Sequence, residues 1–178
     1  MQLANHFLIA VPAQAPSMFS GSVVYITEYN PHQGAIGVII NKPISQTLMD
    51  MFNEIDIAQY NPNWAGNRLY LGGPVKAKNG FFLRKTIDYK NNTYELTGNQ
   101  DLLAELGKNK SDLFMSVGYS EWSPMQLESE IGRNNWLVIK GNDNLIFNMD
   151  PAIRYSEALK LAGVNDISSL YFSGDVFA

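Results

Sequence analysis

The sequence of 178 residues contains no cysteine. This absence excludes disulfide bonds and thiolate metal sites, and it is compatible with a reducing compartment. The chain also has no run that approaches the roughly 20 apolar residues of a membrane-spanning helix. The apolar segment 7–11 is short and no basic residue precedes Lys42, so we expect no secretory signal. The resulting expectation is a cytoplasmic protein without a membrane partner.

Charged residues are scarce as well, at 17% of the chain, and the net charge is −4. Only Arg84 and Lys85 are adjacent basic residues. Because binding to nucleic acid depends largely on Lys and Arg that neutralise phosphates, the composition disfavours direct contact with DNA or RNA. Hydrophobic residues make up 46% of the chain and aromatic residues 12%, enough for a sizeable core. We therefore expect a single domain over residues 1–178.

Apolar, β-branched runs at 23–27 and 35–40 flank turn residues at 30–34, a pattern that predicts an antiparallel hairpin. Gly37 lies inside the second run and predicts a bulge or a close approach of two backbones. Shorter runs of the same kind predict further strands at 69–71, 81–83, 93–97, 113–117, 136–139, 145–147 (after a turn at 141–144) and 170–172.

Capping residues followed by apolar residues at helical spacing predict four helices. The clearest start is Ser123-Pro124-Met125-Gln126, where the serine would cap the helix and the glutamine would reach back to it. The other predicted starts are Ser45 or Thr47 (with apolar residues to Ile55), Asn99 (ending at Gly107) and Asp150-Pro151 (ending at Gly163). Because the strands come in hairpins between isolated helices, the pattern favours an α+β fold.

No motif supplies a complete catalytic set. His6 and His32 belong to no paired metal-binding motif, so we predict neither a metal nor a cofactor. No Gly-x-Ser-x-Gly elbow is present. Glu128 and Glu130 are two residues apart on a predicted helix and should point in different directions, which disfavours a carboxylate dyad. Either glutamate alone could still act as the general base of a hydrolase.

Segments in order along the whole chain resemble the YqgE/AlgH family. They are residues 5–10, 22–26, 34–43, 71–75, 80–83, 118–119, 122, 126–128, 130–131 and 135–137. The resemblance implies a cytosolic bacterial protein with a mixed, largely antiparallel, bifurcated sheet and a small barrel-like part, surrounded by helices. One branch of the family is named as a transcriptional regulator through a link to exopolysaccharide gene expression. The resemblance implies no particular biochemical activity.

The chain departs from the family pattern at residues that could carry chemistry. Thr27 and Tyr29 stand where the family usually has Cys and His, and Arg84 stands where it often has His. Met125 replaces a common Gly, and Phe177 replaces the usual final His. These departures argue against a thiol redox mechanism or a His-based metal mechanism in this chain.

We favour a non-enzymatic regulatory or binding protein that holds an unknown small molecule or protein partner in a groove. Gly-rich backbone would supply N–H donors, polar side chains would orient the ligand, and aromatic rings would give apolar contact. The predicted groove residues are Asn41, Pro43, Gly72, Gly73, Pro74, Tyr119, Trp122, Gln126 and Glu128. A hydrolase that uses Glu128 or Glu130 is the alternative. A scaffold with an apolar surface patch and a DNA-binding transcriptional regulator are further, weaker hypotheses.

Overall fold

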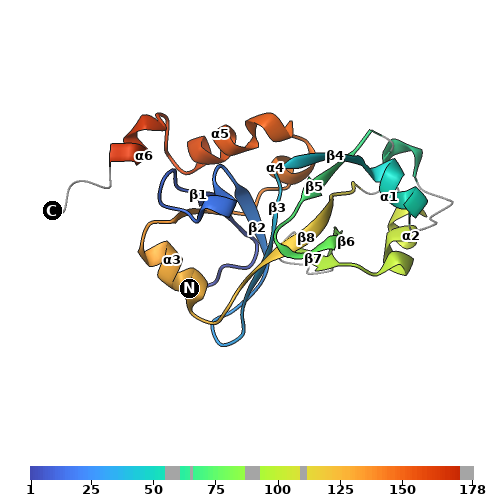
Figure 1. Cartoon of the computed structure of the whole chain (residues 1–178), viewed down its shortest axis with the longest axis horizontal. Coiled ribbons are helices and arrows are strands. Elements are labelled where there is room, and N and C mark those ends of the chain that lie inside the picture. Colours follow the sequence, from blue (N-terminus) through green and yellow to red (C-terminus); the bar gives the residue numbers. More distant parts are fainter. Residues whose placement is uncertain (55–60, 65, 87–92, 109–111, 173–178) are drawn as a thin grey trace.

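The computed structural model describes residues 1–54, 61–64, 66–86, 93–108 and 112–172. Within these ranges nine strands form one sheet, with helices on its faces and at its end (Figure 1). The strands are β1 (His6–Ala10), β2 (Val23–Asn30), β3 (Gly34–Ile39), β4 (Pro43–Thr47), β5 (Arg68–Leu71), β6 (Val75–Lys85), β7 (Tyr94–Thr97), β8 (Met115–Trp122) and β9 (Trp136–Lys140). The helices are α1 (Leu48–Glu54), α2 (Gln100–Lys108), α3 (Gln126–Gly132), α4 (Asp143–Phe147), α5 (Pro151–Leu161) and α6 (Ser168–Phe172). None of the helices in the described ranges is both long and apolar enough to cross a membrane.

The sheet divides at β8. The C-terminal part of β8 pairs antiparallel with β3, whereas its N-terminal part pairs parallel with β5 and antiparallel with β6. We call β3, β2, β1 and β9 the first arm, and β5, β4, β6 and β7 the second arm. The predicted α+β class and bifurcated, largely antiparallel sheet are confirmed. The pairings among the described strands leave the sheet open, so the part expected to resemble a small barrel is not closed.

The β2–β3 hairpin at the centre of the first arm is confirmed. Its register shifts between Ile26 and Glu28, which leaves one extra residue in β2 opposite the Gly37 region of β3. A Cβ atom on Gly37 would lie 2.9 Å from the carbonyl oxygen of Tyr25. The glycine therefore permits both the bulge and the close approach that its position in an apolar strand predicts.

Three groups of buried side chains hold the helices on the sheet. One face of the first arm packs against α4 and α5, and this cluster continues onto the second arm through Tyr70, Leu83 and Tyr94. The opposite face of the first arm packs against α3. The opposite face of the second arm packs against α1 and α2. Apolar residues on both sides of the strands, as the sequence shows for 23–27 and 35–40, are what a sheet covered on both faces requires.

Three of the predicted helix starts carry the expected caps. The Thr47 hydroxyl accepts from the Asp50 N–H at 3.1 Å, and the Asp50 carboxylate accepts from the Thr47 N–H at 2.9 Å. This reciprocal bond lowers the pKa of Asp50. The Asn99 and Asp150 side chains cap α2 and α5 through the N–H groups of Asp101 and Ala152. Gly163 follows α5 at φ 85°, as a helix-terminating glycine does.

The fourth helix start is confirmed only in part. Gln126 reaches back as predicted, and its Oε1 accepts from the Ser123 N–H at 3.0 Å. The helix itself begins at Gln126, and its N-cap residue is Met125, which adopts φ 64° without a side-chain cap. The prediction of a serine cap with Pro124 in the first turn was therefore wrong. A left-handed backbone at this position favours glycine, so Met125 holds a conformation that side chains rarely adopt.

Two predicted strands are helices. Residues 145–147 lie in α4, because the Asn142 side chain caps the segment by accepting from the Asn144 N–H at 2.9 Å. Residues 170–172 lie in α6, where the Asp166 carboxylate accepts from the Ser168 hydroxyl at 2.6 Å and from the Ser168 N–H at 2.9 Å; these bonds lower the pKa of Asp166. In both segments a polar side chain just before a short apolar run decides for a helix over a strand. Ile55 and Phe177 lie outside the described residues.

Candidate functional site

Gly72 and Gly73, which were predicted from the sequence to bind a ligand, lie where the sheet divides at β8. The Gly72 N–H donates to the carbonyl of Val117 at 2.9 Å, and its carbonyl accepts from the Ile39 N–H at 2.9 Å and the Ser120 hydroxyl at 3.1 Å. A Cβ atom on Gly73, which has φ 153°, would lie 2.3 Å from the carbonyl oxygen of Tyr119. The Gly72 backbone is therefore used by the protein, and the segment is built for close packing of strands.

Asn41 is also engaged within the fold. Its Oδ1 accepts from the Val23 N–H and its Nδ2 donates to the Gly21 carbonyl, both at 2.8 Å. Pro43 and Pro74 are exposed. The half-buried Tyr119 ring meets the Phe81 ring edge-on, with 5.2 Å between their centres.

Trp122 and Gln126 converge on Glu130 beneath α3. The indole N–H groups of Trp122 and Trp136 donate to one oxygen of the Glu130 carboxylate, at 3.0 and 2.8 Å. The other oxygen accepts from the Gln126 amide at 3.0 Å. Trp122 is only 1% exposed and stacks on Phe19. These side chains tie α3 to the sheet, so their polar groups already have partners within the protein.

Glu128 points away from Glu130, as predicted, and accepts from the Tyr29 hydroxyl at 2.6 Å. This bond raises the pKa of Tyr29. Neither glutamate lines any of the three cavities described below. Among the described residues no three His, Asp or Glu side chains come together as a metal site. None of these three cavities therefore surrounds the base of the hydrolase alternative.

One cavity lies over β6, between α1 and α2, and we call it the β6 cavity. It has a volume of about 360 Å³. Its floor consists of the buried side chains of Met51, Phe82, Leu103 and Met115. Its rim carries exposed polar residues: Glu54, Lys76, Lys78, Asn79 and Gln100.

The cavity forms where β6 separates from its neighbouring strand β8. The register between β6 and β8 shifts between Val75 and Gly80, and Lys76 adopts φ 47°. Residues 76–79 therefore bulge away from β8, which opens space above the apolar floor. This site was not predicted from the sequence. Lys76, Lys78 and Gly80, just before the predicted strand at 81–83, are typical of an irregular, exposed strand.

Two further cavities lie elsewhere. The α5 cavity, of about 260 Å³, is lined mainly by residues 66–70 and 146–154. A third, of about 400 Å³, lies at the β2–β3 hairpin beside Glu28, Tyr29 and Glu121. None of the nine groove residues predicted from the sequence lines these three cavities in the described part of the chain.

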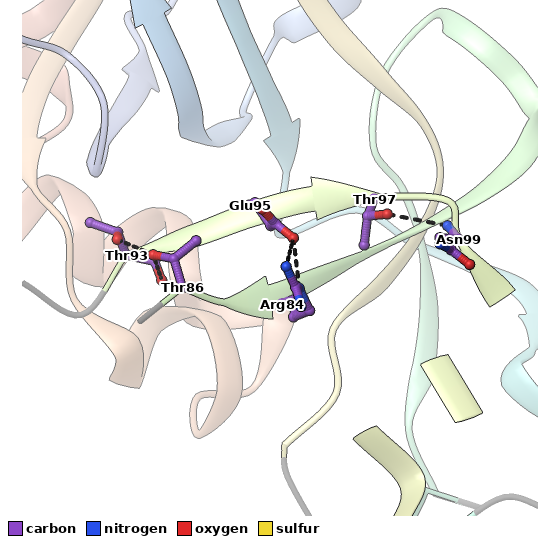
Figure 2. A network of polar contacts seen from close by, with 6 residues as sticks. All are labelled: Arg84, Thr86, Thr93, Glu95, Thr97 and Asn99. Carbon is purple, nitrogen blue, oxygen red and sulfur yellow. Dashed lines mark hydrogen bonds and ion pairs between the residues drawn. The ribbon is translucent and has the colours of Figure 1, made fainter. Parts of the chain in front are cut away.

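The β6–β7 hairpin carries a polar network that includes Arg84 and Glu95 (Figure 2). Arg84 and Glu95 lie opposite each other on the two strands, and the Arg84 Nε–H donates to Glu95 Oε1 at 2.6 Å. Thr86 and Thr93 bond to each other further along the hairpin. The network joins strands, and each member of the Arg84–Glu95 pair remains 38% exposed.

Comparisons with known proteins agree on one family. Residues 7–166 match the model of the DUF179 family, described as AlgH-like. A protein of Ralstonia pickettii described as a UPF0301 protein is 38% identical over 173 residues, covering 93% of this chain and 90% of its own. The solution structure of the AlgH protein from Pseudomonas aeruginosa has a TM-score of 0.73 and 30% identity, covering 96% of this chain and 93% of its own. A crystal structure from Corynebacterium diphtheriae shares the fold at TM-score 0.69 and 19% identity, covering 90% of this chain and 87% of its own.

Proposed function

Because the chain belongs to the AlgH-like family, whose description names no reaction, we propose from its own geometry that it is a non-enzymatic binding protein. The ligand is a small amphipathic molecule with an apolar body and a negatively charged end, and it occupies the β6 cavity. The proposal includes a cytoplasmic location and a single domain, both expected from the sequence. A regulatory role would follow if ligand occupancy changed the contacts of β6, α1 or α2 with a protein partner.

The observation that carries the proposal is an apolar floor beneath a cationic rim. Met51, Phe82, Leu103 and Met115 are each no more than 5% exposed, yet they face an open space of about 360 Å³. Ligand sites typically combine a mostly apolar concave surface of this size with a few placed polar groups. Methionine adapts its shape to different apolar ligands, which suits a floor with two of them.

The rim favours an anionic end group on the ligand. Lys76 and Lys78 are exposed, and among the described residues neither forms an ion pair. Glu54 is the one carboxylate among the residues that line the cavity, and it accepts from Gln46 at 3.2 Å. Two ammonium groups and one carboxylate leave a net positive charge at the entrance, which attracts anions.

The nine groove residues predicted from the sequence stay candidates for partner contact. Pro43, Pro74 and Gln126 are the exposed members. None of the nine residues lines the β6 cavity, so the exposed ones would contact a protein partner and not the small molecule.

Octanoate serves as a probe, since it joins a short apolar chain to a carboxylate. Its binding should be measured by NMR titration on the wild-type protein, Lys78→Glu and the control Lys140→Glu, an exposed lysine of β9. We expect saturable shifts of β6 and α1 resonances and at least fivefold weaker binding in Lys78→Glu only. Native mass spectrometry of gently purified protein would show whether an endogenous ligand is lost from the same variant. Equal octanoate affinity in both variants, or no saturable binding, would refute the proposal.

A further inference from the structure

Arg154 is a buried cation on the second turn of α5, and it is only 3% exposed. Its Nε–H donates to the Met149 carbonyl at 3.0 Å, and its Nη1 donates to the Ile40 carbonyl. The guanidinium carbon lies 5.2 Å from the centre of the Tyr70 ring. All of these partners are neutral. Within the described chain no carboxylate forms an ion pair with Arg154, whereas buried charges in proteins are normally paired.

The guanidinium lines the α5 cavity, where part of its hydrogen-bonding capacity is unused. A guanidinium has five N–H donors. The Met149 and Ile40 carbonyls account for two of them. Burial lowers the pKa of Arg154, whereas the charge of Asp150 acts in the opposite direction. At least two donors therefore remain without an acceptor among the described residues.

The charges around the α5 cavity do not balance. Arg68, an exposed residue at the start of β5, adds a second guanidinium to the cavity wall and has no ion pair among the described residues. Asp150 is the one carboxylate among the lining residues, and its Oδ1 is already used to cap α5 through the Ala152 N–H at 2.8 Å. Two cations and one anion leave the cavity one negative charge short of neutrality.

We propose that the α5 cavity binds a small oxyanion, a phosphate or a carboxylate, between the guanidinium groups of Arg154 and Arg68. A planar guanidinium presents paired donors that match the oxygens of either group, and such charge-assisted bonds are strongest where water is excluded. The site is separate from the β6 cavity. Tyr70, which lines the α5 cavity, packs on one face of the second arm, and Phe82, which lines the β6 cavity, packs on the other.

Thermal unfolding in the presence of anions tests the proposal. Sodium phosphate and sodium acetate are titrated separately against sodium chloride at equal ionic strength, using wild-type protein, Arg68→Gln and the control Arg133→Gln. Arg133 is exposed near the end of α3 and outside the α5 cavity, so the control removes the same charge elsewhere. We expect phosphate, acetate or both to stabilise the wild type and Arg133→Gln, with an apparent affinity at least fivefold weaker in Arg68→Gln. Equal responses of the two variants would overturn the proposal, as would a wild-type response no larger than with chloride.

The side chain of Arg154 provides a direct readout that needs no variant of this buried residue. In a ¹⁵N NMR titration of the wild-type protein, its Nε–H resonance should shift and saturate with the stabilising anion. The anion that saturates at lower concentration identifies the phosphate or carboxylate source. An Arg154 resonance that does not move with either anion would contradict the site.

Discussion

The contact of the first arm with α3 and the cavities beside the second arm differ in how their polar groups are paired. Beneath α3 on the first arm, Glu130 receives three hydrogen bonds from side chains of the protein. On the second arm, Lys78 and Arg68 lie beside open cavities, and neither has an ion pair among the described residues. Buried polar groups with complete internal partners hold a fold together, whereas charges without partners beside empty space are available to a ligand. This contrast separates structural residues from candidate binding residues.

Replacing Glu130 with alanine tests this contrast most strongly. The change leaves the buried indole N–H groups of Trp122 and Trp136 without an acceptor. We expect the free energy of unfolding to fall by about 2–4 kcal/mol, because each unsatisfied buried donor costs about 1–3 kcal/mol. Urea unfolding followed by tryptophan fluorescence gives the value.

Glu128→Ala is the matched control, two residues away on the same helix. It removes one bond from the half-buried Tyr29 hydroxyl, so the loss should stay below about 1 kcal/mol. Similar losses for the two variants would show that Glu130 is no more structural than its neighbour, and the contrast between the arms would fail.

The buried Tyr25 of the first arm predicts a loss of stability at alkaline pH. Tyr25 is 1% exposed, its hydroxyl donates to Asn5 Oδ1 at 2.9 Å, and burial raises its pKa to about 12. A raised pKa means that the folded state prefers the neutral phenol. The stability that the neutral Tyr25 contributes is therefore complete below pH 10 and is lost as the pH rises from 10 through 12. From this pKa difference Tyr25 contributes about 2–3 kcal/mol of that loss.

Urea unfolding of the wild type and Tyr25→Phe between pH 8 and pH 12 measures this contribution. The variant should be less stable at pH 8, where the hydroxyl bond to Asn5 is missing, and should lose less stability towards pH 12. Tyr94, whose pKa burial also raises, accounts for a remaining part of the alkaline loss in both proteins. Parallel pH profiles for the two proteins would be inconsistent with a buried, neutral Tyr25.

Much of the fold could be predicted from the sequence because local signals agreed with tertiary packing. The hairpin of β2 and β3, the Gly37 bulge and the caps at Thr47, Asn99 and Asp150 are all confirmed. The prediction of strands at 145–147 and 170–172 was wrong, because a short apolar run fits a strand or a helix and one capping side chain decides for the helix.

The candidate binding sites could not be predicted in the same way. The aromatic and Gly-rich motifs drew attention to Gly72, Trp122 and Gln126, yet the structure uses their polar groups internally. The β6 cavity depends on a register shift between β6 and β8. The α5 cavity depends on residues more than 80 positions apart in sequence, such as Arg68 and Arg154. No local pattern encodes such long-range geometry.

The Arg84–Glu95 pair should give the smallest effect, although its atoms are very close. The Arg84 Nη2 and Glu95 Oε1 atoms are 2.5 Å apart, but each side chain is 38% exposed (Figure 2). Water and salt screen an exposed pair, so a double-mutant cycle of Arg84→Ala and Glu95→Ala should give a coupling energy below about 1 kcal/mol. The coupling should shrink further in 0.5 M salt, since the screening length falls to a few ångströms. A coupling above about 2 kcal/mol that resists salt would instead place this pair with Glu130, as a polar contact that the second arm needs for its stability.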